Sequence, residues 1–371
     1  MTTPDPQAES GADTAPALDA DAAPAAAEAT AETAAPAPQA DPGTVAPAPL
    51  TAEEAGEHAE RFARLSAEIE SAVLGKREMV RLALVAMLSE GHVLLEDVPG
   101  VGKTTLARAI AAATDGEWQR IQFTPDLLPS DVTGAPVYNQ DTREFQFHPG
   151  PVFSNVVIAD EINRASPKAQ SALLEVMEER QVTVDGRRHP VPRPFLVVAT
   201  QNPVEMDGTY RLPEAQLDRF LVRLSMGYPD TESELAIMRG DRLKDTEELK
   251  TVVDGAQLAE MSAAARRVHI HDAIYSYALG IAHTTRDHEE IHVGVSPRAT
   301  AALMRALRMY VLSEGRHYAT PEDVKALAVP VWAHRLVLAA GSAVSGRTPG
   351  EVLADIVDRA PTPQPVRLGG E

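Results

Sequence analysis

The sequence contains no cysteine, few aromatic residues and no long apolar run. Without cysteine, the chain cannot use a thiolate nucleophile, a cysteine-ligated zinc ion or an iron–sulfur cluster. No apolar stretch approaches the length of about 18 residues that a membrane-spanning helix needs, and the first residues lack the basic and apolar regions of a secretory signal. These absences exclude a disulfide scaffold and a membrane channel, and we expect a cytoplasmic protein with no membrane insertion.

Positive charge is scarce relative to negative charge. The 371 residues include 34 Lys or Arg and 54 Asp or Glu, which gives a formal net charge of −20. Affinity for nucleic acid rests mainly on Lys and Arg, so this balance disfavours a large nucleic-acid-binding surface. A chain of this length is expected to form two domains with a sizeable core.

Residues 1–52 contain no Lys or Arg, and the first such residue in the chain is Arg61. Alanine, proline and acidic residues dominate this segment. Such a composition offers too few large apolar groups to offset the entropy of ordering, so residues 1–52 are predicted to be a disordered tail that keeps the protein soluble. A shorter flexible tail is predicted at 359–371.

Residues 53–228 alternate helical patterns with short apolar runs. Strands are expected at 92–96, 156–159 and 195–200, where the runs are continuous and rich in β-branched residues. Continuous apolar runs are typical of parallel strands that helices cover on both faces. The segment is therefore predicted to be a three-layer α/β domain with a parallel sheet.

Residues 229–358 show helix start signals in place of strands. Thr231 with Glu234, Thr320 with Asp323 and Thr348 with Glu351 have the spacing of capping boxes. A proline follows Thr320 and Thr348 at the first helical position. A smaller all-α domain is predicted to follow the α/β domain.

A glycine-rich loop joins the first predicted strand to a helix. Backbone N–H groups around its glycines, together with the positive end of the helix dipole, favour a bound oxyanion, which is typical of a phosphate-binding loop. Lys103 is expected to reach the β- and γ-phosphates of a nucleotide, and the Thr104 hydroxyl to ligate Mg²⁺. The residues predicted to surround the phosphates are Pro99, Gly100, Val101, Gly102, Lys103, Thr104 and Thr105.

The loop departs from the usual pattern at Asp97, where a glycine is usual. Aspartate tolerates unusual backbone angles better than most residues. Its carboxylate would repel the phosphates if it faced them. We therefore expect the Asp97 side chain to point away from the nucleotide.

Paired acids follow the second apolar run, 57 residues after the loop lysine. Asp160 is expected to hold Mg²⁺ through its water shell, and Glu161 to accept a proton from the attacking water or to orient it. The next run ends near Asn202, whose amide can position that water. Because ligands of α/β folds bind at the carboxyl ends of parallel strands, these side chains are predicted to face the phosphate loop.

Four segments in this order resemble those of the MoxR family of AAA+ ATPases, namely 94–104, 159–165, 199–203 and 212–220. The resemblance covers the chain from about residue 55 to 358. It implies a P-loop AAA+ ATPase domain followed by a helical lid, with ATP and Mg²⁺ as cofactors. It also implies an ATP-dependent homo-hexamer in which each nucleotide lies between protomers.

The resemblance further implies roles that spacing alone does not assign. Arg219 matches an arginine finger that reaches a neighbour's γ-phosphate, and Arg298 matches a sensor that faces the nucleotide from the second domain. A guanidinium suits both roles because it can bind phosphoryl oxygens in a bidentate way. The adenine is implied to lie near Val73 and Gly75, and Arg164 is a candidate for contact with the adjacent subunit.

Two β-hairpins are predicted inside the first domain. One pairs 135–138 with 144–148 across a polar turn, and the other pairs 181–184 with 187–191 across Asp185-Gly186. Loops on a rigid scaffold often carry function, so these hairpins either contact a client or partner or extend the packing between protomers.

The preferred hypothesis is a chaperone-like ATPase that remodels or matures a client protein. The resemblance implies a partner with a von Willebrand factor A-type domain and, in some relatives, metal-cofactor insertion. One alternative is a nucleic-acid-directed ring ATPase, against which the negative charge argues. The other is a nucleotide-switched scaffold with slow turnover, against which the presence of Glu161, Asn202 and Arg219 argues.

Overall fold

The computed structural model describes residues 48–97, 102–202, 210, 212–228, 231–239 and 245–363. The chain divides into two units, Met1–Ala46 and Pro47–Glu371, and every described residue belongs to the second. Most of the predicted N-terminal tail and residues 364–371 of the predicted C-terminal tail therefore lie outside the described residues.

The predicted end of the N-terminal tail at residue 52 is a few residues too late. Leu50 is buried, and its backbone N–H donates to the carbonyl oxygen of Arg267 at 3.4 Å. The Arg267 side chain in turn donates to the carbonyl oxygens of Ala48 and Pro49. These contacts join residues about 200 positions apart, so local composition could not reveal them.

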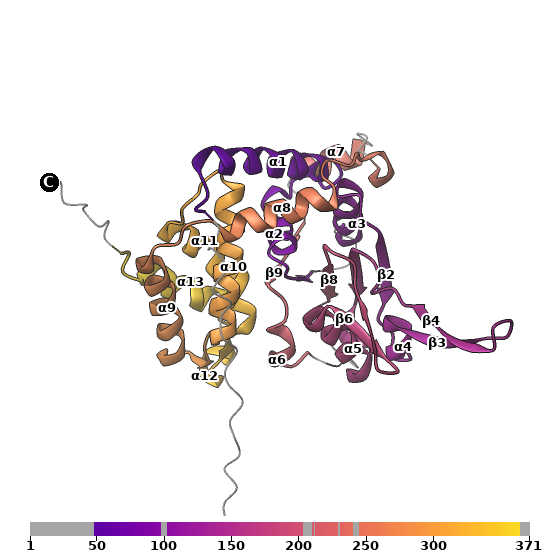
Figure 1. The fold of residues 1–371 in the computed structure, drawn as a ribbon. Coiled ribbons are helices and arrows are strands. Elements are labelled where there is room, and N and C mark those ends of the chain that lie inside the picture. Colours follow the sequence, from indigo (N-terminus) through magenta and orange to yellow (C-terminus); the bar gives the residue numbers. More distant parts are fainter. Residues whose placement is uncertain are drawn as a thin grey trace, which may run out of the picture. The chain divides into compact units, whose positions relative to one another are not determined.

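A five-stranded parallel sheet forms the centre of the first predicted domain (Figure 1). Its strand order is β2–β5–β8–β1–β9, and each neighbouring pair is parallel. The three predicted strands correspond to β1, β5 and β8. The strands of the sheet are β1 (Val93–Glu96), β2 (Trp118–Gln122), β5 (Val156–Asp160), β8 (Leu196–Gln201) and β9 (Val222–Leu224).

Strands β2 and β9 carry weak sequence signals, which explains why they were not predicted. Strand β2 lies at the edge of the sheet, and Ile121 is its single buried residue. Strand β9 has three residues, and the middle one is Arg223. Neither strand has the continuous apolar run that a doubly covered central strand needs.

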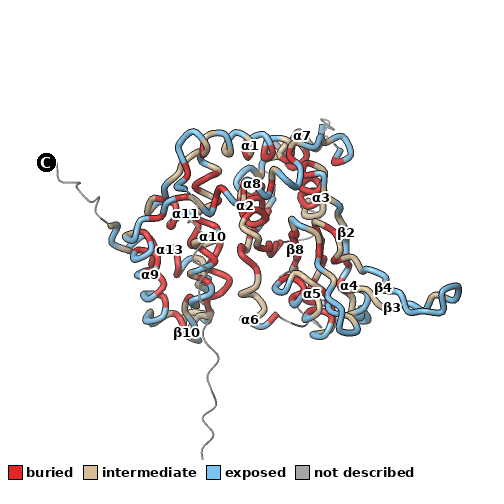
Figure 2. The backbone as a smooth tube through the Cα atoms, viewed as in Figure 1, coloured by how far each residue is buried: buried red, intermediate tan, exposed pale blue. Residues whose placement is uncertain are grey.

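Apolar side chains cover both faces of the sheet, as a three-layer fold requires. In β5, Val156 and Ile158 belong to one buried cluster, whereas Val157 and Ala159 belong to another. Successive strand residues point to opposite faces, so the sheet separates the two clusters. Figure 2 shows the buried segments running through the central strands. The helices of this half are α1 (Ala52–Glu70), α2 (Arg77–Leu88), α3 (Lys103–Ala113), α4 (Pro129–Thr133), α5 (Pro167–Glu179) and α6 (Glu214–Leu217).

The second predicted domain is helical apart from a short antiparallel pair, β10 (Ile291–Val293) with β11 (Val337–Leu338). The predicted capping boxes at Thr320 and Thr348 are present. The one predicted at Thr231 is wrong, because Thr231 is the first residue of its helix and so does not occupy the N-cap position. Its helices are α7 (Thr231–Arg239), α8 (Gly255–Arg266), α9 (Asp272–Asp287), α10 (Pro297–Ser313), α11 (Pro321–Trp332), α12 (Ala340–Val344) and α13 (Pro349–Arg359).

The apolar core is continuous across the predicted boundary at residue 228. Helix α1 contacts α2 and α3 on one side of that boundary and α8 and α10 on the other. Buried residues of these helices belong to a single cluster. The two halves are therefore packed together through α1 and α8, which lie side by side in Figure 1.

Both predicted hairpins are present. Strands β3 (Gly134–Asn139) and β4 (Glu144–Pro149) form the first, and β6 (Gln181–Val184) and β7 (Arg187–Pro190) form the second. The residues of the second turn, Asp185 and Gly186, both have positive φ, at 48° and 75°. That conformation matches the turn that the Asp-Gly pair predicts.

None of the helices in the described ranges combines the length and the apolar character that crossing a bilayer requires.

Candidate functional site

A pocket of about 240 Å³ lies at the carboxyl ends of the central strands. We call it the phosphate pocket. Loops after neighbouring parallel strands meet at this edge, so residues far apart in sequence face one cavity. Its lining residues are Gly102, Lys103, Thr104, Arg120, Gln122, Asp160, Glu161, Thr200 and Asn202.

Six of these lining residues were predicted from the sequence, and the other predicted nucleotide-binding residues fall elsewhere. Pro99, Gly100 and Val101 lie outside the described residues. Thr105, Val73 and Gly75 do not line the phosphate pocket. Val73 is buried and Gly75 has a φ of 68°, and their proximity to an adenine stays a prediction.

Helix α3 begins at the loop lysine, Lys103. Gly102 precedes it with a φ of 95°, a conformation that favours glycine. The Lys103 ammonium donates to the backbone carbonyl oxygen of Asp97 at 2.7 Å. Burial lowers the pKa of Lys103, while the nearby carboxylates oppose that shift. The ammonium is thus held at the mouth of the loop, next to where phosphates would bind.

The Asp97 carboxylate points away from the phosphate pocket, which confirms the prediction. It accepts hydrogen bonds from the Ser225 hydroxyl at 2.9 Å, the Gly227 amide at 3.1 Å and the Met226 amide. All three donors follow strand β9. Asp97 therefore connects the start of the phosphate loop, by hydrogen bonds, to the segment between β9 and the helical half.

Asp160 is held in place by two neighbours. The Thr200 hydroxyl donates to Oδ1 at 3.1 Å, and the Arg120 Nε donates to Oδ2 at 2.6 Å. Arg120 lies on β2, the edge strand that the sequence did not predict. Thr104 lines the same pocket, so a hydroxyl and a carboxylate oxygen are available there. Both are hard oxygen ligands, which is the donor type that Mg²⁺ prefers, so these residues fit that ion.

Glu161 adopts a left-handed backbone conformation, with a φ of 56°. For a residue other than glycine this costs about 1–3 kcal/mol, and such conformations cluster at functional sites. Its backbone N–H donates to the Thr200 hydroxyl oxygen at 3.0 Å, and its carboxylate accepts from Gln122 and Arg164 at 2.8 Å each. Within this chain, Arg164 therefore contacts the predicted catalytic base.

Arg219 and Arg298 do not line the phosphate pocket. They lie together in a second pocket of about 390 Å³, which we call the arginine pocket. Arg298, which the resemblance implies to face the nucleotide from the second domain, thus lies beside Arg219 and not beside Lys103 of its own chain. The charged residues that line the arginine pocket are Glu90, Glu178, Arg180, Asp218, Arg219, Arg298, Arg305 and Arg335.

Contacts between the two halves explain this placement. Arg335, in the 3₁₀ helix that follows α11, forms an ion pair with Asp218 at 3.2 Å and donates to the carbonyl oxygen of Phe220 at 2.7 Å. Burial lowers the pKa of Arg335 to about 10, so it remains charged at neutral pH. These contacts hold the helical half against the Arg219 loop and bring the first turn of α10, with Arg298, to that loop.

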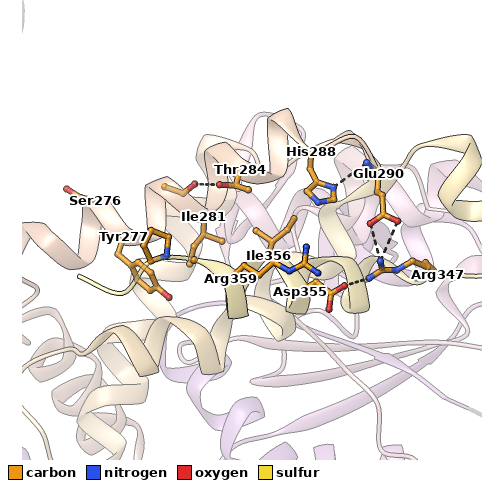
Figure 3. A pocket seen from close by; sticks show the side chains of 13 residues that line it. Ser276, Tyr277, Ile281, Thr284, His288, Glu290, Arg347, Asp355, Ile356 and Arg359 are labelled. Carbon is orange, nitrogen blue, oxygen red and sulfur yellow. Dashed lines mark hydrogen bonds and ion pairs between the residues drawn. The ribbon is translucent and has the colours of Figure 1, made fainter. Parts of the chain in front are cut away.

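A larger pocket, of about 470 Å³, lies among residues of α9 and α13 in the helical half. Figure 3 shows Arg347 between the carboxylates of Glu290 and Asp355. Arg347 bridges Glu290 at 3.2 Å and Asp355 at 2.5 Å. None of the predicted site residues lines this pocket, so its size does not identify the reaction site.

The chain matches two family models. One, described as "ATPase family associated with various cellular activities (AAA)", matches residues 92–222, and the other, an AAA lid domain, matches residues 283–356. The first match contains every lining residue of the phosphate pocket.

Several known proteins match over most of the chain. The uncharacterized protein YeaC of Bacillus subtilis is 46% identical over 296 residues, covering 80% of this chain and 92% of that protein. Chaperone MoxR1 of Mycobacterium tuberculosis is 41% identical over 307 residues, covering 80% and 81%. The crystal structure of a Cytophaga hutchinsonii protein assigned as an ATPase has a TM-score of 0.78 and 36% identity, and the match covers 84% of this chain and 98% of that one. Together with the family models, these matches establish that the chain belongs to the MoxR family of AAA+ ATPases, which bind and hydrolyse ATP.

Proposed function

We propose that copies of this protein assemble into a ring and hydrolyse ATP between them. The phosphate pocket of one copy holds the nucleotide, and the arginine pocket of the next copy supplies Arg219 and Arg298. The observation that carries this proposal is the separation of the two pockets, because neither arginine lines the pocket that contains Lys103. The family resemblance supports a hexamer.

Each residue of the phosphate pocket has a role in this proposal. Lys103 exchanges its bond to a backbone carbonyl for phosphate oxygens. Glu161 orients the attacking water and accepts its proton, and Asn202 positions that water. Thr104 and Asp160 hold Mg²⁺, which neutralises charge on the phosphates when it is bound. For Asp160 to do so, it must release Arg120.

We infer that the free energy of hydrolysis drives chaperone-like remodelling or maturation of a client protein. The first hairpin supports this view, since Phe145 on β4 is 71% exposed and Tyr138 on β3 is 48% exposed. Their rings form an edge-to-face pair with centroids 5.4 Å apart. An exposed aromatic pair on a projecting hairpin suits transient contact with apolar segments (Figure 1).

The family resemblance supplies the finer part of the proposal, which is a partner with a von Willebrand factor A-type domain. It also suggests metal-cofactor insertion as one form of client maturation. A partner of this kind would be tested by measuring whether the purified domain changes the ATPase rate and whether that effect disappears when Phe145 and Tyr138 are replaced with serine.

The shared active site is tested by steady-state ATPase assays on wild type, Glu161→Gln, Arg219→Ala and an equimolar mixture of the two variants. We expect specific activity to rise with protein concentration and each variant alone to be inactive. The mixture should regain activity, because some interfaces would pair an intact Glu161 with an intact Arg219. Activity that is independent of concentration and survives Arg219→Ala would contradict the proposal and favour a monomeric switch.

A further inference from the structure

Glu178, near the end of α5, contacts both arginines that we assign to a neighbour's nucleotide. Its Oε2 lies 3.1 Å from Nε of Arg219, and its Oε1 lies 3.1 Å from an Nη nitrogen of Arg298. The two arginines come from different halves of the protein, one from the loop after α6 and the other from the first turn of α10. The Glu178 carboxylate therefore links them, whereas Asp218, the residue before Arg219, lies farther from Arg298, at 3.9 Å from its Nε.

The way Glu178 contacts Arg219 leaves the phosphate-binding edge of that guanidinium available. The ion pair uses Nε, and Arg219 forms no other ion pair or side-chain hydrogen bond in the part of the chain that the structure describes. A guanidinium has five N–H donors in a fixed planar arrangement. Nε is buried and makes no hydrogen bond, so Glu178 holds this guanidinium by charge, and the two terminal nitrogens stay available for phosphate oxygens.

Charge in the arginine pocket also favours an incoming anion. Five arginines face three carboxylates there. Arg305 has no ion-pair partner among the described residues, and His92 is neutral because burial lowers its pKa to about 4. Glu178 thus cancels part of a positive charge that would otherwise separate Arg219 from Arg298 by repulsion.

We propose that Glu178 is a positioning residue that holds Arg219 and Arg298 as a pair, oriented for the phosphate of the neighbouring subunit's nucleotide. This inference rests on the proposed sharing of the active site between subunits. Glu178 acts through the two arginines and does not itself contact the nucleotide. Its loss should therefore slow turnover without weakening ATP binding in the phosphate pocket of the same chain.

The test is the isosteric variant Glu178→Gln, with Glu175→Gln as the matched control. Glu175 lies one turn earlier on α5, is exposed and has no ion pair among the described residues. Breaking partly exposed ion pairs to two arginines should lower kcat about three- to tenfold, and the KM for ATP should stay within about twofold. The control should behave like wild type, and both variants should keep the wild-type Tm within about two degrees.

Subunit mixing then identifies the face on which Glu178 acts. An equimolar mixture of Glu178→Gln and Glu161→Gln should be more active than the mean of the two variants assayed separately. The reason is that Glu161→Gln supplies an intact arginine pocket to subunits whose Glu161 is intact. A mixture of Glu178→Gln and Arg219→Ala should be no more active than the mean of the two variants, because both substitutions damage the arginine pocket. The gain in the first mixture also shows that Glu178→Gln is folded and able to bind ATP.

Two results would overturn the inference on Glu178. One is unchanged kcat in Glu178→Gln, and the other is regain of activity when it is mixed with Arg219→Ala. Failure of the Glu161→Gln and Arg219→Ala mixture to regain activity would instead contradict the shared active site, so the two failures are distinguishable.

Discussion

Replacing Asp97 tests how the phosphate loop is anchored. Its buried carboxylate accepts three hydrogen bonds from the segment after β9, and the most buried donor is the Met226 amide. In Asp97→Asn, the amide can accept with its oxygen, but its NH₂ group faces a donor. A buried donor left unsatisfied costs about 1–3 kcal/mol, so we expect the free energy of unfolding to fall by about 2 kcal/mol. Urea unfolding followed by circular dichroism would measure this change.

The same variant separates two views of the Asp97 charge. If the carboxylate faced the phosphates, neutralising it would tighten ATP binding. Because it is directed at Ser225, Met226 and Gly227, we expect the Kd for ATP to stay the same or to rise as the loop loosens. Glu96→Gln is the matched control, since it removes the same charge one residue earlier and loses only a partly exposed ion pair with Arg223. Tighter ATP binding and unchanged stability in Asp97→Asn alone would refute the reasoning.

Three further predictions concern other contacts. Thr200→Val removes the hydroxyl that donates to Asp160, so kcat should fall about tenfold with little change in KM. An unchanged kcat in a steady-state assay would contradict a role of Thr200 in positioning Asp160. Arg120→Gln frees Asp160, so the Mg²⁺ concentration for half-maximal activity should fall about two- to fivefold, and an increase would argue against competition. Burial raises the pKa of Asp323, but hydrogen bonds from Arg316 and the helix N-cap outweigh it and lower that pKa below its usual value. The ionised Asp323 therefore contributes its full share to the free energy of unfolding above about pH 4, and this contribution is lost as pH falls through the lowered pKa. The difference in unfolding free energy between wild type and Asp323→Asn should be largest at pH 7 and should shrink below pH 4.

Much of the phosphate pocket could be predicted because its chemistry is local. Lys103, Asp160 and Asn202 each follow an apolar run, and parallel strands bring such positions to one edge. The orientation of Asp97 followed from charge repulsion alone. Arg120 was missed because it lies on an edge strand whose residues are mostly not buried, so no apolar pattern marked the strand.

The placement of Arg298 could not be predicted because it depends on tertiary contacts. The start of α10 is local, since Ser296 caps the helix and Pro297 is its first residue. The position of α10 in space is set by Arg335, which binds the loop around Asp218 from a 3₁₀ helix more than 100 residues away. Glu178 was missed for a related reason. In the sequence, its spacing from Glu175 is also that of an exposed acidic helix face, and only the folded chain brings Glu178 to arginines from both halves.

The most direct test of the shared active site is an experimental structure of Glu161→Gln with ATP and Mg²⁺, because this variant should bind the nucleotide and hydrolyse it slowly. We predict that an Nη atom of Arg219 lies about 3 Å from a γ-phosphate oxygen of the ATP held by Lys103 of the next subunit. Arg219 at the γ-phosphate of its own chain, or distant from every nucleotide in an assembled ring, would contradict the account.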